Sequence, residues 1–169
     1  ATMAMGDALA MVLIDAQKFP IEEYAMNHPA GAIGRALIMK VPDIMRTGDR
    51  LALVSPEATL IDAAVAMTKA QSGSAVVVDE EKRLLGIFTD GDFRRAITEC
   101  EQSNIQTLQN SNIRTFMTAS PLFVHDDAYA ADLLKIFERR HIDDLPVCDS
   151  SGRVVGIVDI QDLPKMKVL

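Results

Sequence analysis

The chain contains an internal repeat, and this repeat limits the folds it can adopt more than any other feature of the sequence. Gly-Ile-Phe at residues 86–88 returns as Gly-Ile-Val at residues 156–158, 70 positions later. The same spacing relates Asp92 to Asp162. A period of this length is too long for a solenoid of short repeats, so it indicates a duplicated small domain.

Each copy is expected to have the element order β-α-β-β-α. In the first copy, a short extended segment at 51–54 precedes residues 59–67, whose apolar positions follow helical spacing. Apolar runs at 75–79 and 84–89, joined by a polar turn, predict two strands, and a short helix should begin near Asp90. The corresponding segments of the second copy are 122–124, 129–137, 145–149, 154–159 and a helix from about Gln161.

The predicted fold is therefore mixed α/β (α+β), with two repeats packed as a pair. Each repeat has about 60 residues, too few to cover both faces of its own sheet. We place the first repeat at 41–98 and the second at 113–169, with a polar linker at 99–112. Residues 1–40 lie outside the repeat and are rich in strong helix formers, which predicts a helical N-terminal segment.

Composition excludes several classes of function. The formal net charge is −7, which argues against a nucleic-acid or anionic-membrane surface, and the chain has no Trp for base stacking. No apolar run is long enough to span a bilayer. Cys100 and Cys148 suggest neither a disulfide framework nor a metal site, and they have no evident activating neighbours. A reducing, cytoplasmic location follows as an expectation.

Four segments resemble the conserved parts of a tandem pair of CBS domains, the module named after cystathionine β-synthase. They are residues 43–45 (Asp-Ile-Met), 86–92, 140–147 and 156–163. The resemblance covers about residues 41–169. It implies two small domains that share one core and a site between them for a nucleotide-like ligand.

The flanking segments resemble one enzyme family more narrowly. Residues 1–10 and 27–35 are similar to the end of the sugar-isomerase (SIS) domain of arabinose-5-phosphate isomerases, and residues 40–49 and 88–95 resemble the same enzymes. That family interconverts ribulose 5-phosphate and arabinose 5-phosphate for Kdo and lipopolysaccharide synthesis. The resemblance implies that most of the isomerase domain lies upstream of this chain, that residues 1–40 are its tail, and that the chain alone is inactive.

Thr89 and Asp92 form the first candidate ligand site. In CBS domains this spacing places a hydroxyl near a phosphate and a carboxylate on the ribose hydroxyls. A carboxylate can accept two hydroxyl hydrogen bonds, while Thr and the helix N-terminus offer donors to an anion. The alternative is that Thr89 or Asp90 caps the helix and Asp92 only favours its dipole.

The second copy departs from this pattern. Asp159 stands where the family usually has Ser or Thr, and a carboxylate there would repel a phosphate. Asp162 keeps the ribose-binding place but could be only structural. We also expect His141, Ile142 and Leu145 to contribute to the ligand site. Four arginines could supply charge to the cleft or lie on solvated helix faces, namely Arg94, Arg95, Arg139 and Arg140.

His28 is the one candidate catalytic residue, and only in a complete enzyme. It matches the family's His before Pro, which the resemblance implies takes part in proton transfer. Imidazole titrates in the range useful for moving a proton between adjacent carbons. From the residues alone, an Asn-His-Pro loop is more often a turn. His125 is expected at the surface, and no metal cluster or cofactor is implied.

Two functions remain open from the sequence. In one, the pair senses a nucleotide or nucleotide-sugar, with a CMP-activated sugar end product as one candidate, and regulates the isomerase. In the other, it binds no ligand and serves assembly, with two pairs forming a dimer and the full-length protein a tetramer.

Overall fold

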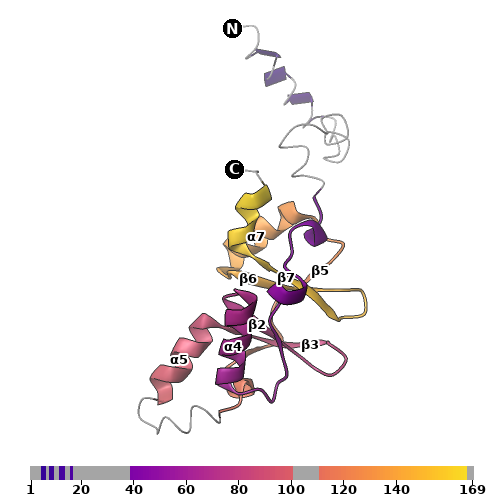
Figure 1. The fold of residues 1–169 in the computed structure, drawn as a ribbon. Helices are drawn as coiled ribbons and strands as arrows, with labels where there is room; N and C mark the ends of the chain where they lie inside the picture. The colour runs from indigo at the N-terminus through magenta and orange to yellow at the C-terminus, as the bar shows by residue number, and fades with distance from the viewer. Residues whose placement is uncertain are drawn as a thin grey trace.

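The computed structural model describes residues 39–100 and 111–166, together with positions 5, 6, 8, 9, 12, 13 and 16. The side chains of residues 99, 100 and 164–166 lie outside this description. Two small sheets are stacked, the first repeat below and the second above (Figure 1). The predicted pair of β-α-β-β-α repeats in a mixed α/β fold is confirmed.

The first repeat contains a parallel β1–β2 pair and an antiparallel β2–β3 pair. Its elements are β1 (Leu53–Val54), α4 (Leu60–Ala70), β2 (Ser74–Val78), β3 (Leu84–Thr89) and α5 (Asp90–Cys100). A short strand that was not expected, β4 (Thr118–Ala119), is added antiparallel to β3. Thr118 and Ala119 are both exposed, so no apolar pattern announces this strand.

The second repeat has the same arrangement. Its elements are β5 (Val124–His125), α7 (Ala130–Arg140), β6 (Asp144–Cys148), β7 (Val154–Asp159) and η4 (Ile160–Met166). The last element is a 3-10 helix, whereas the first repeat ends in the α-helix α5. Three further 3-10 turns are η1 (Val41–Asp43), η2 (Gly48–Arg50) and η3 (Ile113–Thr115).

Local sequence explains the bounds of the helices. α4 begins after Thr59, whose hydroxyl accepts from the backbone N–H of Asp62 at 3.1 Å while the Asp62 carboxylate accepts from the Thr59 N–H at 3.0 Å. The Thr59 hydroxyl also donates to the Asp62 carboxylate at 2.7 Å, and this bond and then the one from the Thr59 N–H hold the pKa of Asp62 below its ordinary value. α4 and α7 are each followed by a residue in the left-handed region, Gln71 (φ 53°) and His141 (φ 51°). The two repeats therefore terminate this helix in the same way.

The leading segments of the two repeats, residues 41–46 and 113–118, are exchanged between them. Arg46 forms an antiparallel bridge with Ile157 of β7, so the leading segment of the first repeat extends the sheet of the second. Val41 is fully buried in the core of the second repeat, whereas Ile113 is fully buried in the core of the first. Each core is therefore completed by a residue from the leading segment of the other repeat.

Two glycines make this exchange possible. A Cβ on Gly86 would lie 2.5 Å from Met117 Sδ, and one on Gly156 would lie 2.6 Å from Met45 Sδ and 3.0 Å from the Arg46 carbonyl oxygen. Real Cβ atoms do not approach other atoms this closely, so β3 and β7 need glycine where the leading segments cross them.

A third apolar cluster joins the two sheets. It contains residues from both repeats, namely Val76, Val78, Ile87, Cys148, Val154 and Ile157. The two hairpins also meet at an antiparallel bridge between Arg83 and Arg153. The pair is thus one packed body, and the surface between its halves is where a shared cleft opens.

Candidate functional site

A cleft of about 1040 Å³ lies between the two repeats. The first repeat supplies most of the lining, with residues from α4, the α4–β2 turn, β3 and the start of α5, and the second supplies the α7–β6 turn and the end of β7. The charged residues that line it are Arg46, Arg95, Asp90, Asp92, Asp143, Asp144 and Asp159. The cleft is therefore acidic.

Thr89 and Asp92 line this cleft where β3 ends and α5 begins. Asp92 Oδ2 accepts from the Thr89 hydroxyl at 2.8 Å and from the Thr89 N–H at 2.8 Å, and the Asp92 N–H donates to Thr89 Oγ1 at 3.2 Å. Arg95 forms an ion pair with the other carboxylate oxygen, Oδ1. The helix-capping alternative is thus realised in the geometry. Asp92 is itself only 4% exposed, whereas the side chain of its partner Arg95 is 66% exposed.

The corresponding carboxylates of the second repeat are engaged by an arginine. Arg46 Nη2 lies 2.7 Å from Asp159 Oδ2, and Arg46 Nε donates to Asp162 Oδ2. Burial alone would lower the pKa of Arg46, but the hydrogen bond to Asp162 and the charge of Asp159 raise it above its ordinary value. Arg46 Nη1 also donates to the Gln71 carbonyl oxygen at 3.3 Å. One buried guanidinium therefore connects the two repeats.

Asp144 carries the most perturbed carboxyl group in the cleft. Burial, and next the negative charge of Asp159, raise its pKa to about 6. Its Oδ1 atom and the hydroxyl of Ser74 are both buried, and neither makes a hydrogen bond of standard geometry. Ser74 is nevertheless near enough to favour the charged form of Asp144. The pair supplies an acceptor and a donor with unused capacity at the boundary between the repeats.

The other predicted ligand residues are distributed differently. His141 and Ile142 line the cleft. Leu145 is fully buried in the core of the second repeat and does not line the cleft, and Asp162, which is 4% exposed, does not line it either. His28 lies outside the described residues.

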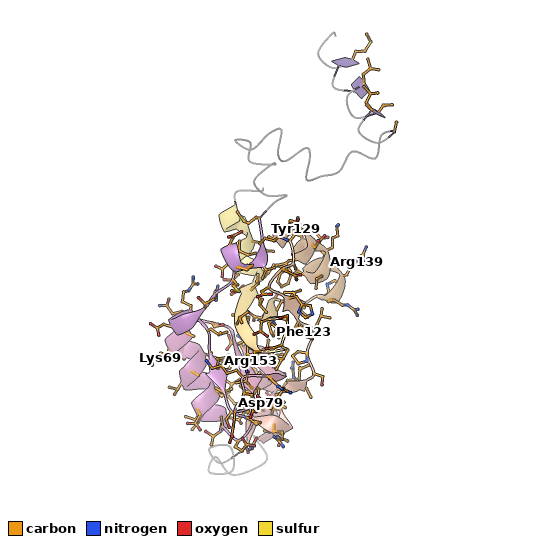
Figure 2. The ribbon with its side chains drawn as sticks, turned by 90° about the vertical axis from the view of Figure 1, so that its right-hand side faces the viewer. Lys69, Asp79, Phe123, Tyr129, Arg139 and Arg153 are labelled. Atoms are coloured by element: carbon orange, nitrogen blue, oxygen red, sulfur yellow. The ribbon has the colours of Figure 1, made fainter. Side chains whose placement is uncertain are left out.

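Of the four arginines considered from the sequence, only Arg95 lines the cleft. Arg139 and Lys69 mark the outer faces of α7 and α4 in Figure 2, and both are exposed. His125 is exposed, as expected. Cys148 is buried, and burial raises the pKa of its thiol to about 11, which leaves it unreactive at neutral pH.

Sequence reasoning missed Arg46 and Asp144. A signal for Arg46 exists: Met45-Arg46 before the first repeat aligns with Met117-Thr118 before the second, at a spacing of 72 rather than 70. This comparison puts Arg and Thr at corresponding places. Nothing local in the sequence marks Asp144 as buried, since Asp143 beside it is exposed.

Two other kinds of feature are not found in the described part of the chain. No group of three or more His, Cys, Asp or Glu side chains in it could hold a metal ion. Among its helices, none combines the length and apolarity needed to cross a bilayer.

The family model of the CBS domain matches the chain twice, at residues 41–99 and 113–165. This chain belongs to the CBS domain family. The match covers the whole region in which both sheets and both leading segments lie.

Curated relatives of this CBS pair extend the likeness to its full length. The arabinose 5-phosphate isomerase KdsD of Yersinia pestis is 40% identical over 169 residues, all of this chain and 50% of that protein. KdsD of Pseudomonas aeruginosa is 40% identical over 168 residues, and KdsD of Escherichia coli K12 is 37% identical over 169 residues. The chain spans about half the length of each of these relatives.

Solved structures of other CBS pairs have the same fold. The CBS domain pair of protein MJ0100, solved in complex with 5-methylthioadenosine and S-adenosyl-L-methionine, is 25% identical with a TM-score of 0.66, covering 77% of this chain and 96% of that one. CBSX2 of Arabidopsis thaliana, solved in complex with AMP, is 24% identical with a TM-score of 0.65, over 77% of this chain and 96% of that one.

Proposed function

We propose that this CBS pair is the regulatory half of an arabinose-5-phosphate isomerase and that it binds a nucleotide or nucleotide-sugar in the cleft between its repeats. The observation that carries the ligand proposal is the cleft itself, with the Thr89 hydroxyl and the Asp92 carboxylate on its wall. A carboxylate at this place suits the two hydroxyls of a ribose, and the start of α5 suits a phosphate.

The proposed chemistry at Asp92 is an exchange of partners. When a ribose arrives, Asp92 Oδ1 releases Arg95, whose side chain is largely exposed, and accepts hydrogen bonds from the sugar instead. Arg95 then remains in the cleft to face a phosphate. Support for an adenosyl or similar ligand comes from the MJ0100 pair, which was solved with two such molecules.

The isomerase proposal rests on the relatives. They are similar to the whole of this chain, and the half of each that it does not cover would carry the reaction. We propose that His28 serves proton transfer there, in the complete enzyme. The apolar helical positions Met5, Leu9, Val12 and Leu13 are between 55% and 65% exposed, which supports an isomerase domain packing over them.

A route from the cleft to that domain is available through residues 39–46. Arg46 lines the cleft, while Val41 N–H donates to the Ala128 carbonyl at 3.0 Å and Lys40 Nζ lies 3.5 Å from the centre of the Tyr129 ring. A ligand that shifts Arg46 would therefore also displace residues 39–46, which contact the residues just before α7.

The test is calorimetry with AMP, CMP and a CMP-sugar on the chain and on two variants. Asp92→Asn should weaken binding at least tenfold, because the amide loses the charge-assisted hydrogen bonds to the ribose. Asp62→Asn is the matched control: it removes the same kind of helix cap at α4, outside the cleft, and should leave binding unchanged. Absence of binding at millimolar ligand, or equal losses in both variants, would contradict the proposal.

An assembly role is the second candidate, and one observation favours it. Ile61 and Val65 are one turn apart on α4 and are 46% and 61% exposed, and Ile97 of α5 is 39% exposed. These residues are exposed apolar side chains on the two helices of the first repeat, α4 and α5. A second CBS pair is the partner whose matching residues would cover them.

A further inference from the structure

The two repeats present equivalent positions at the ends of β3 and β7. The register of the edge strands identifies the residues that correspond: Thr118 pairs with Ile87 of β3, and Arg46 pairs with Ile157 of β7. The first position consists of Thr89, Asp92 and Thr118, and the second of Asp159, Asp162 and Arg46.

These two positions are in different states. In the first, Thr118 is short, neutral and exposed, and all three residues line the cleft. In the second, Arg46 is 7% exposed and its guanidinium contacts both carboxylates, through Nη2 to Asp159 and through Nε to Asp162. Asp162, the counterpart of Asp92, does not line the cleft.

We propose that Arg46 is an internal occupant of the second position, so that the CBS pair binds one small molecule rather than two. The location of the first site rests on the function proposed above; the closure of the second rests only on the contacts of Arg46. A ribose could reach Asp162 only by displacing the guanidinium, which would take the charge of Arg46 away from two buried carboxylates.

Both repeats hold Arg46 in this place. Its main chain is bonded to Ile157, with the Arg46 N–H donating to the Ile157 carbonyl at 2.7 Å and the Ile157 N–H donating back at 3.1 Å. From the other repeat, the Gln71 carbonyl accepts from Nη1. Asp144 adds a further negative charge nearby, which favours the guanidinium. A ligand from solution must therefore compete with a guanidinium whose main chain and side chain are both already held by hydrogen bonds.

The deciding variant gives the second position the same residues as the first. Arg46→Thr combined with Asp159→Thr gives the second position the residues of the first while removing one positive and one negative charge together. We expect the number of AMP or CMP sites measured by calorimetry to rise by one relative to the unmodified chain. The reverse variant, Thr118→Arg with Thr89→Asp, should lower that number by one.

Circular dichroism establishes that each variant is folded before titration. If the first double variant is unfolded, Arg46→Gln with Asp159→Asn replaces it, because this pair removes both charges, shortens the side chain at 46 and keeps the shape of the one at 159. Two sites in the unmodified chain, or no added site in a folded double variant, would overturn the inference. No binding by the unmodified chain together with one site in the double variant would support the inference while contradicting the proposed ligand function.

Discussion

At the scale of single residues, two aspartates of this chain have opposite tendencies. The exposed Asp62 carboxylate accepts hydrogen bonds from Thr59, and these lower its pKa. Asp144 is half-buried in the cleft near Asp159, and desolvation and then the charge of Asp159 raise its pKa to about 6. The charged form of Asp144 is therefore costly for the fold.

Replacing Asp144 with Asn should stabilise the chain at neutral pH. Because the pKa of Asp144 in the folded state lies above its ordinary value of 3.8, the folded state binds a proton more tightly than the unfolded state, and stability falls as pH rises from about 4 through 6. This difference corresponds to at most about 3 kcal/mol. Urea unfolding at pH 5 and pH 7.5 measures it.

The gain from Asp144→Asn should be larger at pH 7.5 than at pH 5. Asp143→Asn, on the exposed neighbour, is the control and should show little gain at either pH. An equal effect of Asp144→Asn at both pH values would show that Asp144 is not the group that titrates.

Gly156 is the residue on which the crossing of the leading segment depends. Gly156→Ala should cost about 1–3 kcal/mol, because its Cβ would meet Met45 Sδ and the Arg46 carbonyl oxygen. The loss appears as a lower melting temperature or urea midpoint. Gly91→Ala is the control, since its Cβ would make only ordinary contacts at 3.5 Å. A Gly156→Ala chain as stable as the control variant would contradict this packing.

At the scale of elements, sequence patterns predicted the apolar strands of each sheet but missed the short edge strand β4. β3 and β7 have the expected bounds, because each is an apolar run closed by a polar turn on one side and a capping motif on the other. β4 has two exposed residues and could not be found this way. The exchange of leading segments joins Arg46 to Ile157, which lie more than 100 positions apart in the chain. The spacing of apolar residues within one short segment cannot predict such a contact.

The candidate site divides in the same way. Thr89 and Asp92 were found because their spacing forms a local motif at the start of a helix. Arg46 was missed because its partners, Asp159 and Asp162, lie in the other repeat. A sequence shows which side chain could bind a ligand, but long-range packing decides which side chain already has a partner.

The elements around the cleft also predict which nucleotides are favoured. Both arginines that line the cleft are already paired with aspartates, while within the described residues Asp90, Asp143 and Asp144 have no ion-pair partner. A triphosphate adds negative charge where this excess lies, and each close charge pair costs about 1 kcal/mol even in water. We expect ATP to bind about tenfold or more weakly than AMP.

Calorimetry at 50 mM and 300 mM salt measures this preference, and the difference between AMP and ATP should shrink at the higher concentration because salt screens the repulsion. Asp90→Asn should also reduce the difference in affinity between AMP and ATP. ATP binding more tightly than AMP at both salt concentrations would contradict an acidic cleft of this kind.

At the scale of the whole molecule, the exposed apolar residues Ile61, Val65 and Ile97 predict that two copies of this chain associate. Val65→Glu should shift the chain towards monomer, because a charge at the centre of an apolar contact loses its hydration without gaining a partner. Sedimentation velocity over a concentration series measures the shift. Lys69→Gln, also on the surface of α4, changes the net charge by the same amount and is the control. Identical sedimentation of the Val65 variant and the unmodified chain would exclude these residues as the interface.

The exchange of leading segments also sets an order of events during synthesis. Residues 41–46 leave the ribosome more than 100 residues before β7, the strand that receives them. Until β7 is made, Val41 has no complete core to enter, and Arg46 lacks both of its aspartates. The first repeat likewise waits for residues 113–118 to complete its own core. Stable folding of the first repeat must therefore follow synthesis of the start of the second, and residues 41–46 find their final partners only after β7 is made.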